Sequence, residues 1–272
     1  MTTDASDEWK QWHEHRTARV SGPCGPLALT GTYWLEDHPE GRIPEVPGQW
    51  TQDGDAVVLT AVEKDGLTVD GVPFTGKVRL EADRGPVAAA RVAAGERRLV
   101  VLVREGVWGV RDYDPGSPGR LAFRGIDATP YDSRWSLEGH FTPYGEHRTV
   151  RVENADGRHR GLGLGGVLAF TLDGQDLTLQ VSVEDDGSLW AVFADTTSGD
   201  GSYPFRFLRP PAPDAEGCTT VDFNRALLPP CAFADHFVCP FPPPGNTLPA
   251  AIEAGERTLL QTARQSPWSS VS

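Results

Sequence analysis

The sequence predicts a mainly β protein: antiparallel β-sandwich or barrel halves with a short N-terminal helix and a proline-rich C-terminal strap. Short apolar runs recur from residue 56 onwards, separated by Gly, Asp and Asn turns, at a spacing of roughly 8–12 residues that is typical of a sandwich or barrel. No helical pattern lies between these runs, so a parallel βαβ architecture is not expected. Residues 77–81 and 134–141 alternate between apolar and polar side chains, which indicates sheets with one face in water.

The N-terminal helix is expected to start at a cap provided by Ser6 or Asp7 and to run to about Val20. Trp9 and Trp12 are three residues apart and share one helix face, so we expect them to anchor the helix to a sheet. The Gly- and Pro-containing segment 21–26 ends the helix.

The expected strands divide into two β-rich halves, residues 1–145 and 146–272, which form two domains or one continuous unit. The first series lies at residues 27–35, 56–62, 66–71, 77–82, 89–94, 97–103, 106–112 and 120–125. The second series lies at residues 134–144, 147–154, 165–174, 177–187, 188–195, 203–208 and, as the last strand, 218–223. Hairpin turns are expected at Asp173-Gly174 and Asp186-Gly187. A polar tail is expected from near Thr258.

The glycine-rich segment RHRGLGLGG, residues 158–166, superficially resembles a phosphate-binding loop. No helix follows it, so it lacks the helix N-terminus that gives such loops their attraction for phosphate. We expect a flexible connection or a bulge at this segment.

Composition excludes several classes of partner. The net charge of −13 argues against nucleic acid, which requires a clustered positive field. The longest apolar runs, such as residues 99–103, are strand-sized, so no transmembrane helix is expected. The N-terminus is acidic and lacks the apolar core of a signal peptide. We therefore expect a cytoplasmic protein with no membrane partner, in a compartment that keeps thiols reduced. The sequence indicates no oligomeric state.

The segment 222–256 is the proline-rich strap, with seven of the chain's 23 prolines and two of its four cysteines. Proline lacks the backbone N–H that a helix interior or a central strand requires, so the strap is expected to be rigid and extended. Four phenylalanines alternate with the prolines, and we expect them to dock into the body of the protein: Phe223, Phe233, Phe237 and Phe241.

The strap motif DFNRA..PPCAF....CP.PPP.N.L...I.AGE, with F.D.TSG..Y...RFL before it, resembles the bacterial family DUF1684, which is common in actinobacteria. The likeness is dense over residues 193–256 and looser upstream. The family's activity was not established when it was named, so the resemblance implies important positions rather than a reaction. Leu227 and Leu228 stand where the family usually has Tyr-Asn, Gly245 replaces an acidic residue, and the loop 36–48 differs. These departures imply an apolar site wall, and with it a divergent ligand or a lost activity.

The candidate site residues come from these motifs, since a carboxylate beside an arginine suits an orienting clamp or a general base. The catalytic candidates are Asp195, Arg206, Asp222 and Cys231, and the candidates for ligand contact are Trp190, Tyr203, Asn224, Arg225, Leu227, Leu228, Phe233 and Asn246. In the alternative interpretation, Arg206, Asp222 and Asn224 hydrogen-bond the strap, whose carbonyls lack their usual partners.

The pattern Cys231-x4-His236-x2-Cys239 offers a nucleophile with a base, or three metal ligands. Its spacing is not that of a known zinc knuckle, so packed thiols are the favoured interpretation and no metal is predicted. A Cys231–Cys239 disulfide is the remaining alternative.

These features favour a cofactor-independent protein with an aromatic-lined cavity for a small, largely apolar organic molecule. Trp108, Trp135, Trp190 and the strap phenylalanines would supply the lining. No redox-cofactor fingerprint is present, so any chemistry would be of the isomerase, cyclase, lyase or hydrolase type. The alternatives are a non-catalytic β-module that binds a protein, and a thiol- or metal-dependent hydrolase that uses the Cys-His strap.

Overall fold

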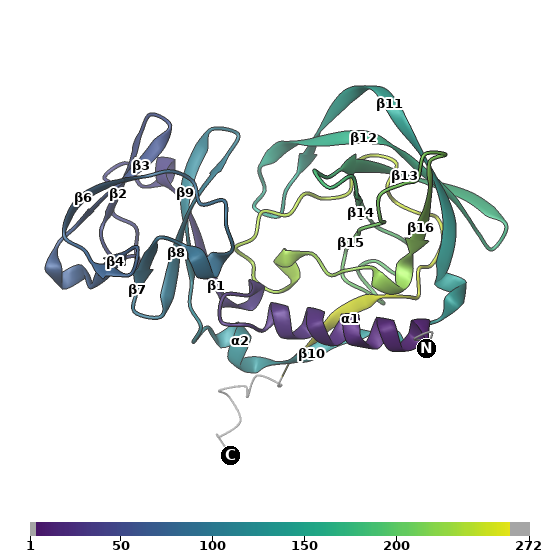
Figure 1. Cartoon of the computed structure of the whole chain (residues 1–272), viewed down its shortest axis with the longest axis horizontal. Coiled ribbons are helices and arrows are strands. Elements are labelled where there is room, and N and C mark those ends of the chain that lie inside the picture. Colours follow the sequence, from purple (N-terminus) through teal and green to yellow (C-terminus); the bar gives the residue numbers. More distant parts are fainter. Residues whose placement is uncertain (1–3, 262–272) are drawn as a thin grey trace, which may run out of the picture. The chain divides into compact units, whose positions relative to one another are not determined.

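A computed structural model describes residues 4–261 and shows a mainly β fold built from antiparallel sheets, as the sequence predicts (Figure 1). The chain forms two compact units. Unit 1 comprises the chain up to residue 17, residues 122–232 and the chain from residue 238 onwards, and unit 2 comprises residues 18–121 and 233–237. Residue 145, near which the sequence predicts two β-rich halves to meet, lies inside a strand of unit 1. No helix within residues 4–261 is long and apolar enough to cross a membrane.

Unit 2 contains two antiparallel sheets. Its strands are β1 (Leu29–Trp34), β2 (Gln49–Asp53), β3 (Ala56–Ala61), β4 (Leu67–Val69), β5 (Val72–Pro73), β6 (Gly76–Leu80), β7 (Val92–Ala94), β8 (Arg97–Arg104) and β9 (Val107–Tyr113). One sheet has the order β1-β9-β8-β7-β4-β5 and the other the order β2-β3-β6. Trp50, Leu59 and Leu99 are fully buried in the core of this unit, because alternate positions of its strands carry apolar side chains.

Unit 1 is organised around a six-stranded antiparallel sheet of order β15-β14-β13-β12-β11-β16. These strands are β11 (Ser136–Glu153), β12 (His159–Leu172), β13 (Gln175–Val183), β14 (Leu189–Phe193), β15 (Arg206–Leu208) and β16 (Cys218–Asp222). A separate pair joins β10 (Phe123–Ala128) to β17 (Glu256–Gln261). The core includes Phe170, Phe193 and Phe223, whose rings meet edge to face at centroid distances of 5.4 and 5.7 Å.

Both expected hairpins are confirmed. Leu172 pairs with Gln175 across Asp173 and Gly174, and both turn residues have positive φ (48° and 78°), as a tight hairpin turn requires. The second turn contains Gly187 with φ 80° and connects β13 to β14.

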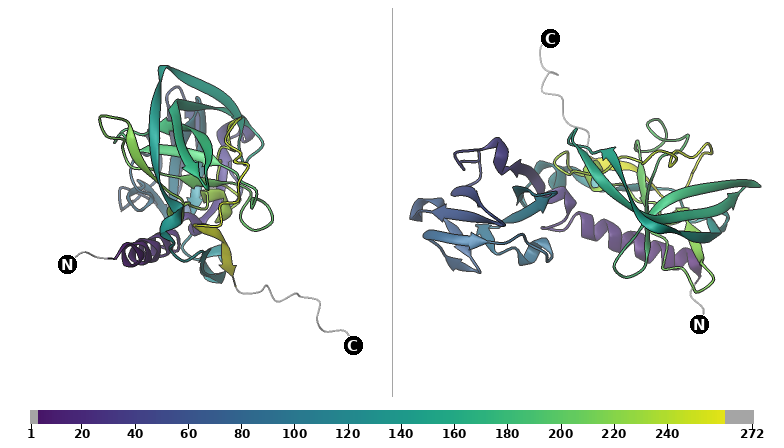
Figure 2. Two further views of the ribbon diagram at one scale, coloured as in Figure 1. Left: turned by 90° about the vertical axis from the view of Figure 1, so that its right-hand side faces the viewer. Right: turned by 90° about the horizontal axis from the view of Figure 1, so that it is seen from above.

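The glycine-rich segment 158–166, for which the sequence predicts a flexible connection or a bulge, is not a flexible connection, because most of it belongs to β12. An irregularity of register does lie opposite it, between Pro143 and Arg148 of β11. Its leucines alternate with glycines: Leu162 and Leu164 are buried, while Gly161 and Gly163 are exposed. This is the two-residue period of a strand with one buried face. Gly166 allows close approach, since a Cβ there would lie 2.4 Å from both the Phe141 ring and the Thr142 carbonyl oxygen. In Figure 2 the pair β11–β12, in teal, forms a long twisted ribbon.

Four further expectations are corrected by the structure. The two strands expected at 134–144 and 147–154 form the single strand β11, which carries a register irregularity between Pro143 and Arg148. The first part of the strand expected at 120–125 belongs to the short helix α2 (Pro118–Ala122). Only Arg206–Leu208 of the strand expected at 203–208 is extended and paired. Strand β17 includes residues 258–261, where the sequence predicts a polar tail, so β17 rather than β16 is the last strand. The rest of the expected tail, residues 262–272, lies outside the described residues.

The helix α1 (Ala5–Val20) confirms the expected helix, with a different start. Asp4 rather than Ser6 or Asp7 precedes the first turn, and its carbonyl oxygen accepts the N–H groups of Asp7 and Glu8. Trp9 is buried and donates from Nε1 to the Asn224 carbonyl oxygen at 2.8 Å. The helix is therefore anchored to the strap rather than to a sheet.

The strap is extended, with short 3-10 turns at Phe223–Arg225 and Pro230–Ala232, as expected from its prolines. Phe223 is buried in unit 1, and the Phe241 ring lies 5.2 Å from that of Phe205. Phe233 and Phe237 are buried and belong to unit 2. The expected docking of the phenylalanines is confirmed.

Candidate functional site

An open cavity of about 820 Å³ lies within unit 1. Three segments line it, residues 129–135 before β11, residues 197–202 in the turn after β14, and residues 252–257 at the end of the strap. Its lining side chains are mixed in character and include Tyr131, Asp132, Ser133, Arg134, Trp135, Thr197, Ser202, Glu253 and Arg257. Buried polar side chains behind the cavity fix each of the three segments.

The first segment is positioned by Asn224, which is 1% exposed. Its side-chain amide donates to the Asp132 carbonyl oxygen and accepts from the Asp132 N–H, both at 3.0 Å. The Asp222 carboxylate accepts from the backbone and side-chain N–H groups of Asn224 at 3.1 and 2.9 Å. Because both ends of the amide are satisfied, Asn224 holds the chain at Asp132 in one place.

The second segment is a turn held by Asp195. The Asp195 carboxylate accepts the Thr197 N–H at 2.8 Å, and the Ser198 hydroxyl accepts the Asp195 N–H at 3.0 Å. The hydroxyls of Thr197 and Ser202 lie 2.9 Å apart and close the turn. Asx and Ser/Thr side chains commonly stabilise turns in this way. The polar turn that the sequence predicts between residues 195 and 203 is confirmed.

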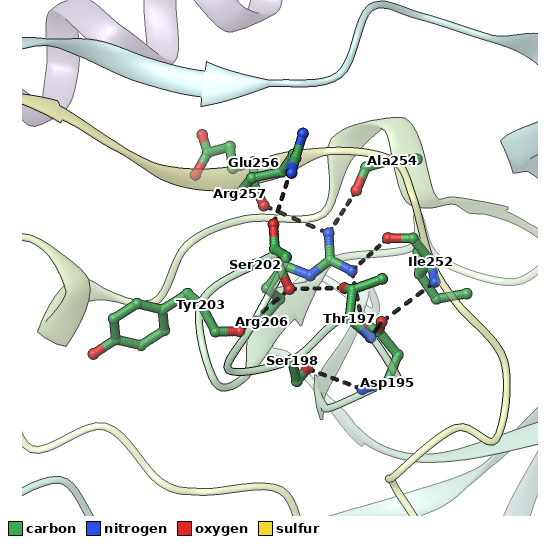
Figure 3. Close-up of polar contacts among 11 residues, drawn as sticks. Asp195, Thr197, Ser198, Ser202, Tyr203, Arg206, Ile252, Ala254, Glu256 and Arg257 are labelled. Carbon is green, nitrogen blue, oxygen red and sulfur yellow. Dashed lines mark hydrogen bonds and ion pairs between the residues drawn. The ribbon is translucent and has the colours of Figure 1, made fainter.

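The third segment is held by Arg206. Its guanidinium donates to the carbonyl oxygens of Ile252 and Ala254, as Figure 3 shows. The same guanidinium contacts the Asp195 carboxylate at 2.7 Å, and both side chains have no exposed surface. Asp195 also accepts the Ile252 N–H at 3.3 Å, so one ion pair joins the second wall of the cavity to the third. Arg206 Nε is buried without a hydrogen-bond partner among residues 4–261.

Burial determines the electrostatics of this pair. Loss of water lowers the pKa of the Arg206 guanidinium, and the Asp195 carboxylate opposes that change. The nearby positive charge of Arg257 adds to the lowering. An arginine stays protonated at neutral pH, so Arg206 and Asp195 form a charged buried pair that supports the cavity wall.

Charged side chains on the cavity surface are arranged unevenly. Arg134 lies over the Trp135 ring at 4.7 Å and contacts two carboxylates, Asp132 at 3.1 Å and Glu253 at 3.8 Å. Arg257 donates from Nε to the Gly201 carbonyl oxygen at 3.0 Å. A second, smaller cavity of about 310 Å³ shares Arg134, Trp135 and Glu253 with the first.

The predicted catalytic and ligand-contact residues are absent from the lining of both cavities. Of the aromatic residues expected to line a cavity, Trp135 lines both, whereas Trp108, Trp190 and the strap phenylalanines line neither. The structure brings Asp195, Arg206, Asp222 and Asn224 into the network behind the larger cavity, where they position its walls. Arg206 hydrogen-bonds carbonyl oxygens of the strap, which is the alternative to a catalytic role that the sequence leaves open. Asn224 holds the backbone of Asp132 instead. Catalysis by these residues stays a prediction.

The other predicted ligand contacts are dispersed through the fold. Arg225 pairs with Asp222 at 3.4 Å and lies over Trp12, and the Leu228 N–H donates to the Glu256 carboxylate. The Asn246 amide is satisfied by backbone groups of Gln180 and Val192. Leu227 forms a backbone bridge with Phe207, and the Trp190 ring packs on the Phe207 ring. Phe233 belongs to unit 2, whereas the cavity lies in unit 1.

The cysteines are thiols, which agrees with the favoured interpretation. Cys231 and Cys239 are buried, the Cys231 N–H points to Cys239 Sγ at 3.3 Å, and the Tyr203 hydroxyl lies 3.7 Å from Cys231 Sγ. Within the described part of the chain, which contains Cys231, His236 and Cys239, no three His, Cys, Asp or Glu side chains are placed to hold a metal ion.

Sequence reasoning missed most of the cavity-lining residues. The strap motif included Glu253, but Tyr131, Arg134 and Arg257 lie outside the motifs that drew attention. The available signal was the DTTSGDGSY turn, because its hydroxyl residues Thr197 and Ser202 do line the cavity. Identifying the other two walls requires the long-range contacts of Asn224 and Arg206.

Comparison with known proteins gives a family and no activity. No curated protein matches the chain. A solution NMR structure of an uncharacterized protein from Haloarcula marismortui, gene locus rrnAC0354, matches with 33% sequence identity, covering 50% of this chain and 77% of that chain, with a TM-score of 0.42. The model of the family DUF1684, described as a protein of unknown function, matches residues 121–257, and all residues that line the two cavities lie within that range. The chain therefore belongs to the DUF1684 family.

Proposed function

We propose that this protein binds a small organic molecule in the 820 Å³ cavity of unit 1. The observation that carries the proposal is the way the cavity is built: the buried side chains of Asn224, Asp195 and Arg206 hydrogen-bond the backbone of all three of its walls. Its volume lies in the range of about 300–1,000 Å³ found for small-molecule sites. Fixed walls favour binding because little conformational entropy is lost when a ligand enters.

The ligand we propose is more polar than the one that the sequence predicts. The lining contains two arginines, two carboxylates and several hydroxyls in addition to Tyr131 and Trp135. Leu227 and Leu228, which suggested an apolar wall, lie elsewhere. Asp132 and Glu253 are carboxylates that acid–base chemistry on a bound molecule would require. With these carboxylates as acid and base, turnover of the bound molecule would require no cofactor.

The proposal is tested with a fragment library, observed by saturation-transfer NMR on the wild-type protein and on Ser133→Trp. Ser133 is an exposed residue in the cavity lining, and its side chain makes no hydrogen bond among residues 4–261, so an indole there fills space without breaking a contact. Thr178→Trp, at an exposed position of β13 away from the cavity, is the matched control. We expect binders that Ser133→Trp loses and Thr178→Trp keeps. A library that yields no binder, or binders insensitive to Ser133→Trp, contradicts the proposal.

A protein-interaction module receives less support. The large apolar side chains that are exposed within residues 4–261 are Val62, Val72, Leu121, Val183 and Leu260, and each belongs to a different element or loop. A protein interface normally needs a contiguous apolar patch.

A further inference from the structure

Arg257 is a cavity-lining arginine held in a fixed orientation. It is the second residue of β17, and its Nε donates to the Gly201 carbonyl oxygen at 3.0 Å. A guanidinium has five N–H donors in a rigid planar fork. One is used by Gly201, which leaves the four donors of the two Nη atoms for another partner.

The carboxylate next to Arg257 in sequence does not pair with it. Glu256 is fully buried and accepts from Arg16 at 3.0 Å and from the Leu228 N–H at 2.7 Å. Successive side chains of a strand point to opposite faces, and in Figure 3 the side chains of Glu256 and Arg257 point apart. Among residues 4–261, Arg257 has no carboxylate within 4.0 Å.

Arg134 provides the contrast within the same cavity. It contacts both Asp132 and Glu253, so its charge is already compensated. One cation and two carboxylates therefore meet at Arg134, whereas the Arg257 guanidinium has no carboxylate partner among residues 4–261. The buried Asp195 carboxylate behind the cavity does not supply one, because it pairs with Arg206. Burial is the main cause of the lowered pKa of Arg206, and the positive charge of Arg257 adds to the lowering because the two guanidinium groups lie near each other.

From this arrangement we infer that the ligand of the cavity carries one carboxylate group, which Arg257 binds through its two Nη atoms. The inference rests on the proposed function and names the class of its ligand. The planar fork of an arginine matches a carboxylate in a bidentate geometry. The hydroxyls of Thr197 and Ser202, in the turn whose Gly201 carbonyl oxygen binds Arg257, also line the cavity and add polar surface. The Asp132 and Glu253 carboxylates line the same cavity and disfavour a second negative charge, so the ligand is a monoanion.

The test compares small carboxylic acids with their uncharged amides, starting with phenylacetate and phenylacetamide and including other pairs of that kind. Dissociation constants are measured by NMR titration at low salt for the wild-type protein, Arg257→Gln and Arg134→Gln. We expect each acid that binds to bind about tenfold more tightly than its amide, which corresponds to about 1.4 kcal/mol. Arg257→Gln is expected to remove this preference, because it weakens the binding of the acids more than that of the amides.

Arg134→Gln is the matched control, since it removes an arginine of the same cavity whose charge is already compensated. We expect it to keep the preference for acids. If amides bind as well as acids, or if Arg257→Gln leaves the preference intact, the inference is wrong while the proposed function stands. If neither member of any pair binds and the fragment library also yields no binder, both are wrong.

Discussion

The Asp195 carboxylate and the Arg206 guanidinium meet at 2.7 Å with no exposed surface on either side chain, and together they hold two of the three walls of the cavity. Removing two charges from water is costly, and their attraction offsets that cost only when the remaining donors and acceptors are also satisfied. Here backbone groups of Thr197, Ile252 and Ala254 are the other partners, and Arg206 Nε is the one donor of the pair that has none among residues 4–261. The pair is therefore a positioning device for the cavity.

Asp195→Asn is expected to lower the free energy of unfolding by about 3–5 kcal/mol, because it leaves the buried Arg206 charge uncompensated while changing the shape of the side chain very little. Urea unfolding followed by far-UV circular dichroism measures the change. Glu184→Gln is the control, since its partner Arg209 lies at 3.4 Å on the surface, and a surface pair contributes about 1 kcal/mol or less. Equal effects of the two substitutions would show that the buried pair does not support the fold.

Asn224→Ala is expected to loosen the wall at Asp132. The Asp132 N–H loses its acceptor at 3.0 Å, so its hydrogen exchange should accelerate roughly tenfold, as expected for the loss of one buried hydrogen bond. Native-state hydrogen exchange resolved by NMR measures the rate. Asn154→Ala serves as the control, because the amide of Asn154 holds the Val238 carbonyl oxygen instead. Unchanged exchange at Asp132 in Asn224→Ala would contradict the assigned role.

Two glycines of β12 should respond differently to alanine. At Gly166 a Cβ would lie 2.4 Å from both the Phe141 ring and the Thr142 carbonyl oxygen, whereas at Gly163 nothing lies within 4 Å. Gly166→Ala is expected to destabilise the protein by about 1–3 kcal/mol through overpacking. Gly163→Ala is expected to be neutral or slightly stabilising, since it removes freedom from the unfolded chain. Thermal unfolding compares the two, and equal stabilities would rule out close packing at Gly166.

Asp83, in unit 2, is expected to make the free energy of unfolding depend on pH. Burial raises the pKa of its carboxyl, although the N–H of Val101 donates to it at 2.8 Å. A raised pKa in the folded state adds stability below the unfolded pKa of about 3.9, and that stability is lost as the pH rises through the folded pKa. Asp83→Asn does not titrate, so its stability relative to the wild type should increase from pH 3.5 to pH 7. Urea unfolding at both pH values measures the difference, and the opposite trend would show a lowered pKa.

Thiol accessibility should separate the cysteines. Cys218 is exposed, whereas Cys231 and Cys239 are buried. With an aromatic disulfide reagent, we expect about one thiol to react rapidly in the native protein, because reaction requires access to the thiolate. Cys218→Ser should remove this fast phase, and Cys231 and Cys239 should react only on unfolding. A fast phase that persists in Cys218→Ser would show that another thiol is accessible, either the half-buried Cys24 or a strap cysteine, and Cys24→Ser in the same background distinguishes the two.

The fold class was predictable because its signals are local. Alternating strands, the Asp173-Gly174 turn and the proline content of the strap each depend on a few neighbouring residues. The sequence did not predict a strand at the glycine-rich part of β12, because glycine has low strand propensity. The close packing of Val183 on Gly165 and of Phe141 on Gly166 explains two of its glycines. Strand β17, residues 256–261, was not predicted because its partner is distant in sequence. That partner, β10, is formed by residues 123–128, more than 120 residues earlier in the chain.

Some residues of the candidate site were predictable from the sequence, but the role predicted for them, contact with a ligand or catalysis, differs from the supporting position they have in the structure. Asp195, Arg206 and Asn224 stood out as polar residues in a specific motif, and the structure places them together behind one cavity. Their separation from the lining could not be inferred, because it depends on which side chain faces inward. Arg257 gave no signal in sequence. Its distinguishing property, a guanidinium without a carboxylate partner among residues 4–261, exists only once Gly201 and Glu256 are placed in space.

The anchoring of α1 determines where this protein can be cut. The family match covers residues 121–257, which include the Glu256 carboxylate but not Arg16, the helix residue that pairs with it at 3.0 Å. The same cut removes Trp9, whose Nε1 caps the Asn224 carbonyl oxygen. A fragment trimmed to the family boundaries would retain a buried negative charge and lose its counter-charge. An expression boundary that preserves unit 1 therefore has to start before the helix, well outside the region by which the family is recognised.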